Sequence, residues 1–290
     1  MTVKVIRHGS PGPDDEGYAR ALGAALADTV SDLDRAPDMF NIALSEALLH
    51  VNARLAVDPS AVGIDTWEAV VGAMEVGSAV FASAAVAEGM VQCRIDHELR
   101  TIPATGLRGC STSGNWLTAF WFAIVCRDQQ RMNQLCAFPV ESLRASAVDA
   151  GAQVDSHMYD WVEALQAYWM ERPGLVEKLT EAINGSYPEI ARVAPRDLLE
   201  KILYQPINLF HRFLRRDHEG FNEALVEALQ HHKEYWTAAE DRERSVEGYL
   251  ALGPLAIACL AYDAGFPVEV ESEYLPQHLL RRDWLGEFPA

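Results

Sequence analysis

The stretch FHRFLRRDHEGFNEAL (residues 210–225) decides the fold, because an apolar segment, an Arg-Asp pair and an amphipathic segment follow one another in it. A weak copy of the same order occurs earlier, in WFAIVCRDQQRMNQLC (residues 121–136). When the two stretches are aligned, they share three polar positions, which are Arg127, Asp128 and Asn133 in the first copy and Arg216, Asp217 and Asn222 in the second. The repeat predicts two similar supersecondary units.

Each copy is expected to be a helical hairpin with a sharp turn at its Arg-Asp pair. The Asp carboxylate can accept hydrogen bonds from the free N–H groups of the helix that it starts. After Asp217, apolar residues recur at helical spacing and form one face, which consists of Phe221, Leu225, Ala228, Leu229, His232 and Trp236. The six shared polar residues therefore mark structural turns and imply no chemistry.

The first hundred residues also show a mainly helical pattern. Tyr18, Leu22 and Leu26 begin a helical repeat after Asp14, which is a candidate cap. Further helices are expected over residues 39–57 and 66–87, and Asp65 is the candidate cap of the second.

The helical period then gives way to strand-like alternation over residues 90–103, with a turn at Asp96 and His97. The predicted fold is mainly α, a multi-helix bundle or helical-hairpin array with one small β-hairpin. We expect a single domain over 1–290, with two lobes that share a core (about 1–110 and 111–290) as the alternative.

Composition narrows the possible partners. The 290 residues are 49% hydrophobic, and 24 Lys and Arg against 42 Asp and Glu give a net charge of −18. No basic cluster stands out, so direct binding to nucleic acid is not expected. An acidic surface suits solubility or a basic protein partner.

Cysteine spacing and the apolar segments indicate a cytoplasmic protein. The five cysteines are odd in number and form no CxxC pair, so reduced and buried thiols are expected. The N-terminus has no apolar segment of the kind found in a signal peptide. The most apolar run, residues 249–262, is too short to cross a bilayer and contains a Gly-Pro break, so it predicts a buried helix and no membrane contact.

Motifs for catalysis or metal binding are weak. The histidines lack HExxH spacing and no GxSxG occurs, so neither a metal nor a cofactor is expected. Arg7-His8-Gly9 follows β-branched residues and resembles the motif of histidine phosphatases, which leaves a phosphatase as the enzyme alternative. Helices follow the motif where those enzymes need alternating strands, so His8 is expected to be a surface residue.

A longer resemblance runs through nearly the whole chain. It is carried by TWEAVVGAMEVGSAVF, RTIPATG, GNWLTAFWFAIVCRD and PVESLRAS, and later by YWMERPGLVEKL, APRDLLEKILYQPINLFHRFLRRD and VEVESEYLPQHLL. In their order these segments resemble the immunity 49 family (Imm49), immunity proteins of bacterial polymorphic toxin systems. The resemblance implies a mainly helical protein without catalytic activity that binds and neutralises a cognate toxin. A helical scaffold that binds a host protein is the alternative.

Two acidic rows are the candidate partner-binding residues. VEVESEY places Glu269, Glu271 and Glu273 on one side of an extended segment. Asp14, Asp15 and Glu16 form a second row. Such rows could pair with Lys and Arg of a basic toxin, for which a nuclease is the plausible class. The alternatives are a charged edge that prevents aggregation, for the first row, and ordinary helix N-terminal charge, for the second.

Overall fold

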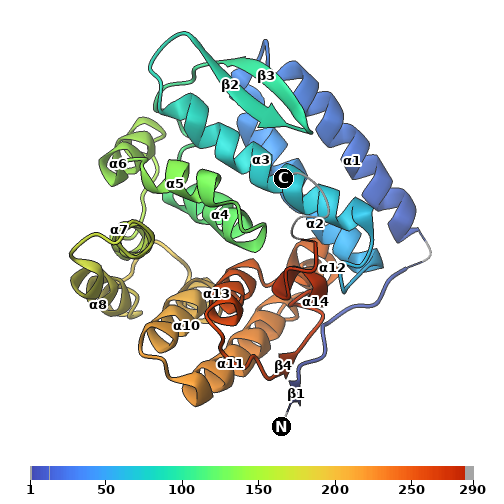
Figure 1. Cartoon of the computed structure of the whole chain (residues 1–290), viewed down its shortest axis with the longest axis vertical. Helices are drawn as coiled ribbons and strands as arrows, with labels where there is room; N and C mark the ends of the chain where they lie inside the picture. Colours follow the sequence, from blue (N-terminus) through green and yellow to red (C-terminus); the bar gives the residue numbers. More distant parts are fainter. Residues whose placement is uncertain (1, 13, 285–290) are drawn as a thin grey trace.

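Helices make up most of the chain, which the computed structural model describes over residues 2–12 and 14–284 (Figure 1). The N-terminal part contains α1 (Asp15–Asp32), α2 (Phe40–Val57) and α3 (Ile64–Ala84), with a 3-10 turn at Pro37–Met39 before α2. These are the three helices predicted from apolar periodicity, with small shifts at their ends.

The C-terminal part is a series of mostly shorter helices, several of which begin at or just after a proline. They are α4 (Ser113–Val125), α5 (Gln129–Cys136), α6 (Val140–Asp149), α7 (His157–Trp169), α8 (Leu175–Gly185), α9 (Arg196–Leu198), α10 (Tyr204–Leu214), α11 (His218–Trp236), α12 (Glu240–Arg244), α13 (Leu252–Asp263) and α14 (Gln277–Leu280). A π-helical turn at Leu199–Leu203 leads into α10, and a 3-10 turn at Val246–Tyr249 precedes α13. The prediction of a mainly α fold is confirmed.

The predicted β-hairpin consists of β2 (Met90–Ile95) and β3 (Glu98–Pro103), which pair antiparallel. Its turn residues Asp96 and His97 have φ of 56° and 60°, as a two-residue turn of type I′ requires. A second, parallel ladder pairs β1 (Val3–Lys4) with β4 (Val270–Glu271) and ties the start of the chain to its C-terminal part. This ladder was not predicted.

The centre of the molecule is α4, which packs against α3, α5, α7 and α13. Its aromatic side chains are buried on more than one side of the helix, and Trp116 Nε1 donates to the Leu135 carbonyl at 2.9 Å. A Cβ on Gly77 of α3 would lie 3.0 Å from the Ala119 Cβ, so this glycine permits the close approach of α3 and α4. One cluster of buried hydrophobic residues extends from Val5 to Leu280. The alternative of two lobes stays a prediction.

One helical stretch in the described part of the chain, Val246–Asp263, is long and apolar enough to be compared with a membrane span. Its mean hydropathy is 1.2, and 61% of it is buried inside the protein. Its α13 portion packs against α4 and α10. The packing is that of a core helix.

Two predicted helix starts are wrong in detail. At α3 the cap position is held by Gly63, and no side-chain capping hydrogen bond is made among the described residues. The Asp58 carboxylate accepts from the Gly63 N–H and the Thr66 hydroxyl, both at 2.8 Å, and so fixes the segment that leads into the helix. Asp65 instead lies in the first turn, 3.5 Å from the Arg54 guanidinium. At α1, Asp14 holds the cap position, but its side chain accepts no capping hydrogen bond. A carboxylate several residues before a helix can bind the groups at its start. Local sequence patterns do not reveal such a contact.

The two Arg-Asp turns have the same geometry. Arg127 and Arg216 have left-handed backbones, with φ of 56° and 53°. The Asp128 N–H donates to the Ala123 carbonyl and the Asp217 N–H to the Arg212 carbonyl, which closes the preceding helix in each copy. Each Asp carboxylate then accepts from a backbone N–H three residues later, at 2.9 Å for Asp128 and 3.0 Å for Asp217.

Candidate partner-binding surfaces

Arg7 and His8 of the Arg7-His8-Gly9 motif lie in the interior, so the expectation of a surface histidine is wrong. Only 5% of His8 is exposed, and its Nδ1 lies 2.7 Å from the Tyr274 hydroxyl, to which its backbone N–H also donates. Burial lowers the pKa of His8, and the positive charge of Arg7 adds to the effect. Arg7 donates to the Leu55 carbonyl at 2.8 Å and stacks over the Tyr249 ring. The tripeptide joins the two ends of the chain, and its histidine faces buried tyrosines.

The strand row consists of exposed residues, but its three glutamates differ in their surroundings. Glu271 is paired in register with Lys4 of β1. Glu273 lies 3.6 Å from the Nε of buried Arg7. The Glu269 N–H donates to the Asn222 side chain at 2.7 Å, which fixes the segment before β4 on α11. The row is therefore partly engaged in holding the chain ends together.

A second line of glutamates, which the sequence analysis missed, runs along α11 beside this strand. Glu219, Glu223 and Glu227 are spaced four residues apart and are exposed. Among the described residues, none of the three forms an ion pair. Their spacing was visible in EGFNEALVE, but only the apolar face of this helix had been followed.

Between the two rows lies a hollow of about 640 Å³, which we call the acidic groove. Apolar residues line its floor, and Glu219, Glu223 and Glu269 line it from both sides. The apolar lining residues are Val3, Val226, Pro267 and Val270. A surface of this kind, apolar within and acidic at the margin, fits a basic protein segment.

The carboxylates of Asp15 and Glu16 in the N-terminal row bind groups of the protein itself. Asp15 accepts from the Gly12 N–H at 2.6 Å. Glu16 accepts from buried Arg54 at 3.0 Å and lies 3.7 Å from Arg20. Asp14 alone is fully exposed. Asp14, Asp15 and Glu16 therefore offer less free charge than Glu219, Glu223 and Glu227 of α11.

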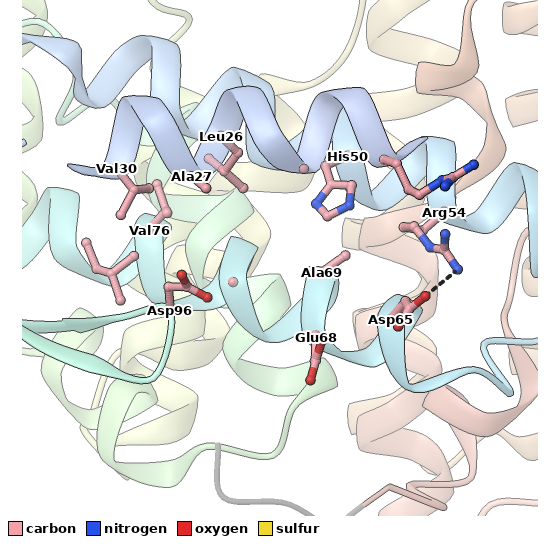
Figure 2. Close-up of a pocket in the computed structure, with 14 residues that line it drawn as sticks. Leu26, Ala27, Val30, His50, Arg54, Asp65, Glu68, Ala69, Val76 and Asp96 are labelled. Carbon is pink, nitrogen blue, oxygen red and sulfur yellow. Dashed lines mark ion pairs between the residues drawn. The ribbon is translucent and has the colours of Figure 1, made fainter. Parts of the chain in front are cut away.

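A separate groove of about 290 Å³ lies between α1 and α3, which we call the α1–α3 groove. Figure 2 shows Leu26 and Val30 on the α1 side, Ala69 on the α3 side and His50 of α2 between them. Arg54 and Asp65 form an ion pair at one end, and Asp96 of the hairpin turn lies at the other. Burial lowers the pKa of His50, with a further contribution from the charge of Arg54.

Each wall of this groove contains a glycine, Gly23 on α1 and Gly72 on α3. On α1, a Cβ at Gly23 would lie 3.0 Å from the His50 ring, so packing explains that glycine. On α3, a Cβ at Gly72 would meet no atom within 4 Å. Glycine inside a helix costs about 0.5–1 kcal/mol relative to alanine. Packing within the chain gives no reason for Gly72.

Glu75 is a fully buried carboxylate that sequence reasoning passed over. It is 0% exposed, accepts from the Asp96 N–H at 2.8 Å and lies 3.3 Å from the Arg131 guanidinium. Burial raises its pKa, against the opposing charge of Arg131. The residue ties the hairpin turn and α5 to α3. The only sign of this residue in the sequence was a single acidic side chain within the apolar stretch GAMEVGSAVF.

The two asparagines that follow the Arg-Asp turns, Asn133 of α5 and Asn222 of α11, also bind neighbouring segments. Asn133 accepts from Trp169 Nε1 of α7 at 2.7 Å, and the Asn222 amide donates to the Pro267 carbonyl at 2.8 Å. Of the turn arginines, Arg127 donates to the carbonyls of Leu279 and Leu280, at 2.7 and 2.8 Å. Arg216 is exposed and makes no side-chain hydrogen bond within the part of the chain described.

The described residues hold no grouping of three or more His, Cys, Asp or Glu side chains suited to a metal ion. All five cysteines are buried and free. Burial raises the pKa of Cys93 and Cys259 to about 11 and that of Cys136 to about 12. These thiols therefore remain protonated at neutral pH and are poor nucleophiles.

Comparison with known families identifies the chain. The family model for immunity protein 49 matches residues 58–279. The chain belongs to the immunity protein 49 family. No curated protein and no solved structure matches it. The match to the immunity protein 49 family begins at Asp58, just before α3, and ends in α14, so it contains every residue of the acidic groove except Val3.

Proposed function

We propose that this chain is a non-catalytic immunity protein that binds a cognate bacterial toxin in the cytoplasm and neutralises it by occupying its surface. The observation that carries the proposal is membership of the immunity protein 49 family over residues 58–279. An immunity protein of this kind needs a stable surface and no reactive group, and the surface must complement the toxin in shape and charge.

The acidic groove supports a basic toxin as the partner. A nuclease is the favoured class, because enzymes that hold nucleic acid need clustered Lys and Arg. Glutamates on α11 and beside β4 would pair with those side chains, and the apolar floor would exclude water from the centre of the contact. The net charge of −18 would also speed association with a basic protein.

Co-expression tests the proposal. The toxin domain encoded beside this chain's gene should arrest growth of a sensitive host when expressed alone, and growth should recover when this chain is co-expressed. The two proteins should also co-purify. Arrest that persists at a high level of this chain would contradict the proposal, and binding to a host protein with no toxin in the neighbourhood would favour the scaffold alternative.

Charge reversal tests the surface. Glu219 and Glu223 line the acidic groove, and Glu271 follows the lining residue Val270 in β4. Exchanging these three glutamates for lysine should slow association with the toxin by about tenfold or more and weaken its dependence on salt, because rim charges act mainly on the on-rate. Glu273 is left unchanged because it lies against buried Arg7.

A matched control carries the same change in net charge. Glu141, Glu177 and Glu189 are exposed and lie outside the acidic groove, and none forms an ion pair among the described residues. Their exchange for lysine should reduce the on-rate only by the general loss of negative charge. Equal on-rates for the two triple variants would remove the acidic groove from the interface.

A further inference from the structure

We infer that the α1–α3 groove is a socket for one large apolar side chain of the toxin, presented next to a lysine or arginine. The inference rests on the proposed function for the identity of the partner. It adds a second contact region, distant in sequence from the acidic groove, with its own apolar anchor.

The first observation is space that the chain itself does not fill. Gly72 lies in the interior of α3, half-buried, and a Cβ there would meet no atom within 4 Å. Glycine weakens a helix, so a glycine with no close neighbour in the fold is best explained by an outside group that approaches the backbone at that point. Gly77, five residues later on the same helix, shows the contrasting case, since Ala119 of α4 lies against it.

The second observation is the lining of the groove. Leu26, Val30 and Ala69 form apolar walls of a hollow of about 290 Å³, and each of the three is itself almost fully buried. That volume lies just below the range for ligand pockets, roughly 300–1,000 Å³, and suits a single large side chain. Anchoring side chains of protein interfaces are aromatic or large aliphatic groups seated in such pockets.

The third observation is the charge at the margin. Glu68 and Asp96 are exposed at the groove and form no ion pair with other described residues. Arg54, in contrast, is held by Glu16 and Asp65, at 3.0 and 3.5 Å, and is more than nine-tenths buried. Arg20 also lines the groove, 3.7 Å from Glu16. The lining therefore contains two arginines against the three carboxylates of Asp65, Glu68 and Asp96, and this excess of negative charge favours a positive group beside the apolar anchor.

The apolar walls and the charge together point to a protein segment as the occupant. Such a segment offers a large apolar side chain and a neighbouring lysine or arginine, which a purely apolar small molecule does not.

The test fills the groove with a larger side chain of this protein. Gly72→Leu places a side chain in the open space without a clash at the Cβ, and Gly72→Ala is the matched control that adds the Cβ alone. The probe is the toxin domain encoded beside this chain's gene, made inactive by mutation, and its affinity is measured by titration calorimetry. Gly72→Leu should weaken binding by about tenfold or more, whereas Gly72→Ala should change it by less than about threefold.

A second variant keeps the test decisive if Gly72→Leu perturbs the helix. Glu68→Lys alters only the margin of the groove and should weaken binding by about three- to tenfold through its charge. If the original chain binds the toxin and both Gly72→Leu and Glu68→Lys bind it equally well, the socket is wrong and the proposed function stands. If the original chain fails to bind, the proposed function itself is wrong.

Discussion

Two glycines of α3, Gly72 and Gly77, differ in the space that surrounds them. Gly72 faces open space, whereas a Cβ at Gly77 would lie 3.2 Å from the Ala119 Cα. We expect Gly72→Ala to raise the free energy of unfolding by about 0.5–1 kcal/mol, since alanine restricts the unfolded chain and favours the helix.

Gly77→Ala is the internal control for this prediction. It should lower the free energy of unfolding by about 1–3 kcal/mol, because α3 and α4 must move apart to admit the methyl group. Urea denaturation of the two variants gives both values. Destabilisation by Gly72→Ala would mean that the space at Gly72 is not open.

At the scale of elements, the two Arg-Asp turns allow a matched comparison. Both arginines adopt a left-handed backbone that costs a non-glycine residue about 1 kcal/mol. We expect Arg216→Gly to stabilise the protein by up to about 1 kcal/mol, because the exposed arginine makes no side-chain hydrogen bond with described residues.

Arg127→Gly should have the opposite effect, although the backbone is the same. It removes the hydrogen bonds to Leu279 and Leu280 and the ion pair with Asp263 at 3.1 Å, so a loss of about 2–4 kcal/mol is expected. Thermal unfolding of the two variants distinguishes them. Similar changes in melting temperature would show that the Arg127 contacts contribute little.

The same turns show what a sequence can predict. Helices, the hairpin at residues 90–103 and the Asp caps at Asp128 and Asp217 depend on neighbours a few residues apart, so their patterns are local. The ladder of β1 and β4 has two residues in each strand, too few for any periodicity. The burial of His8 depends on Tyr274, which lies far away in the chain, so no local pattern could show it. Of the residues that line the acidic groove, Glu269 was predicted to bind a partner and Asn222 only to mark a turn, because the groove joins α11 to a distant strand.

At the scale of the whole molecule, buried histidines make the fold sensitive to acid. Burial lowers the pKa of His8, His50, His157, His211 and His232, and that of His232 falls to about 4. An unfolded histidine has a pKa of about 6.5, so the unfolded chain binds more protons between pH 6.5 and 4. Stability is therefore full above about pH 6.5 and is lost as the pH falls through that window.

His232 alone should account for roughly 2 kcal/mol of this loss between pH 7.5 and 5. His232→Gln keeps a donor near the Gly248 carbonyl, which lies 2.9 Å from the histidine Nε2, but cannot take up a proton. Its unfolding free energy should be lower at pH 7.5 and should depend less steeply on pH. Equal slopes for the two proteins would contradict the role of His232.

The central claim concerns the molecule as a neutralising partner that performs no chemistry, and titration of toxin activity tests it most directly. Increasing amounts of the purified chain are added to a fixed concentration of the neighbouring toxin, well above the dissociation constant, and the remaining activity is measured. The account predicts a linear fall that reaches zero at a fixed ratio of the two proteins. Full loss of activity at a small fraction of that ratio would reveal an enzyme, and activity that does not fall would contradict the immunity function.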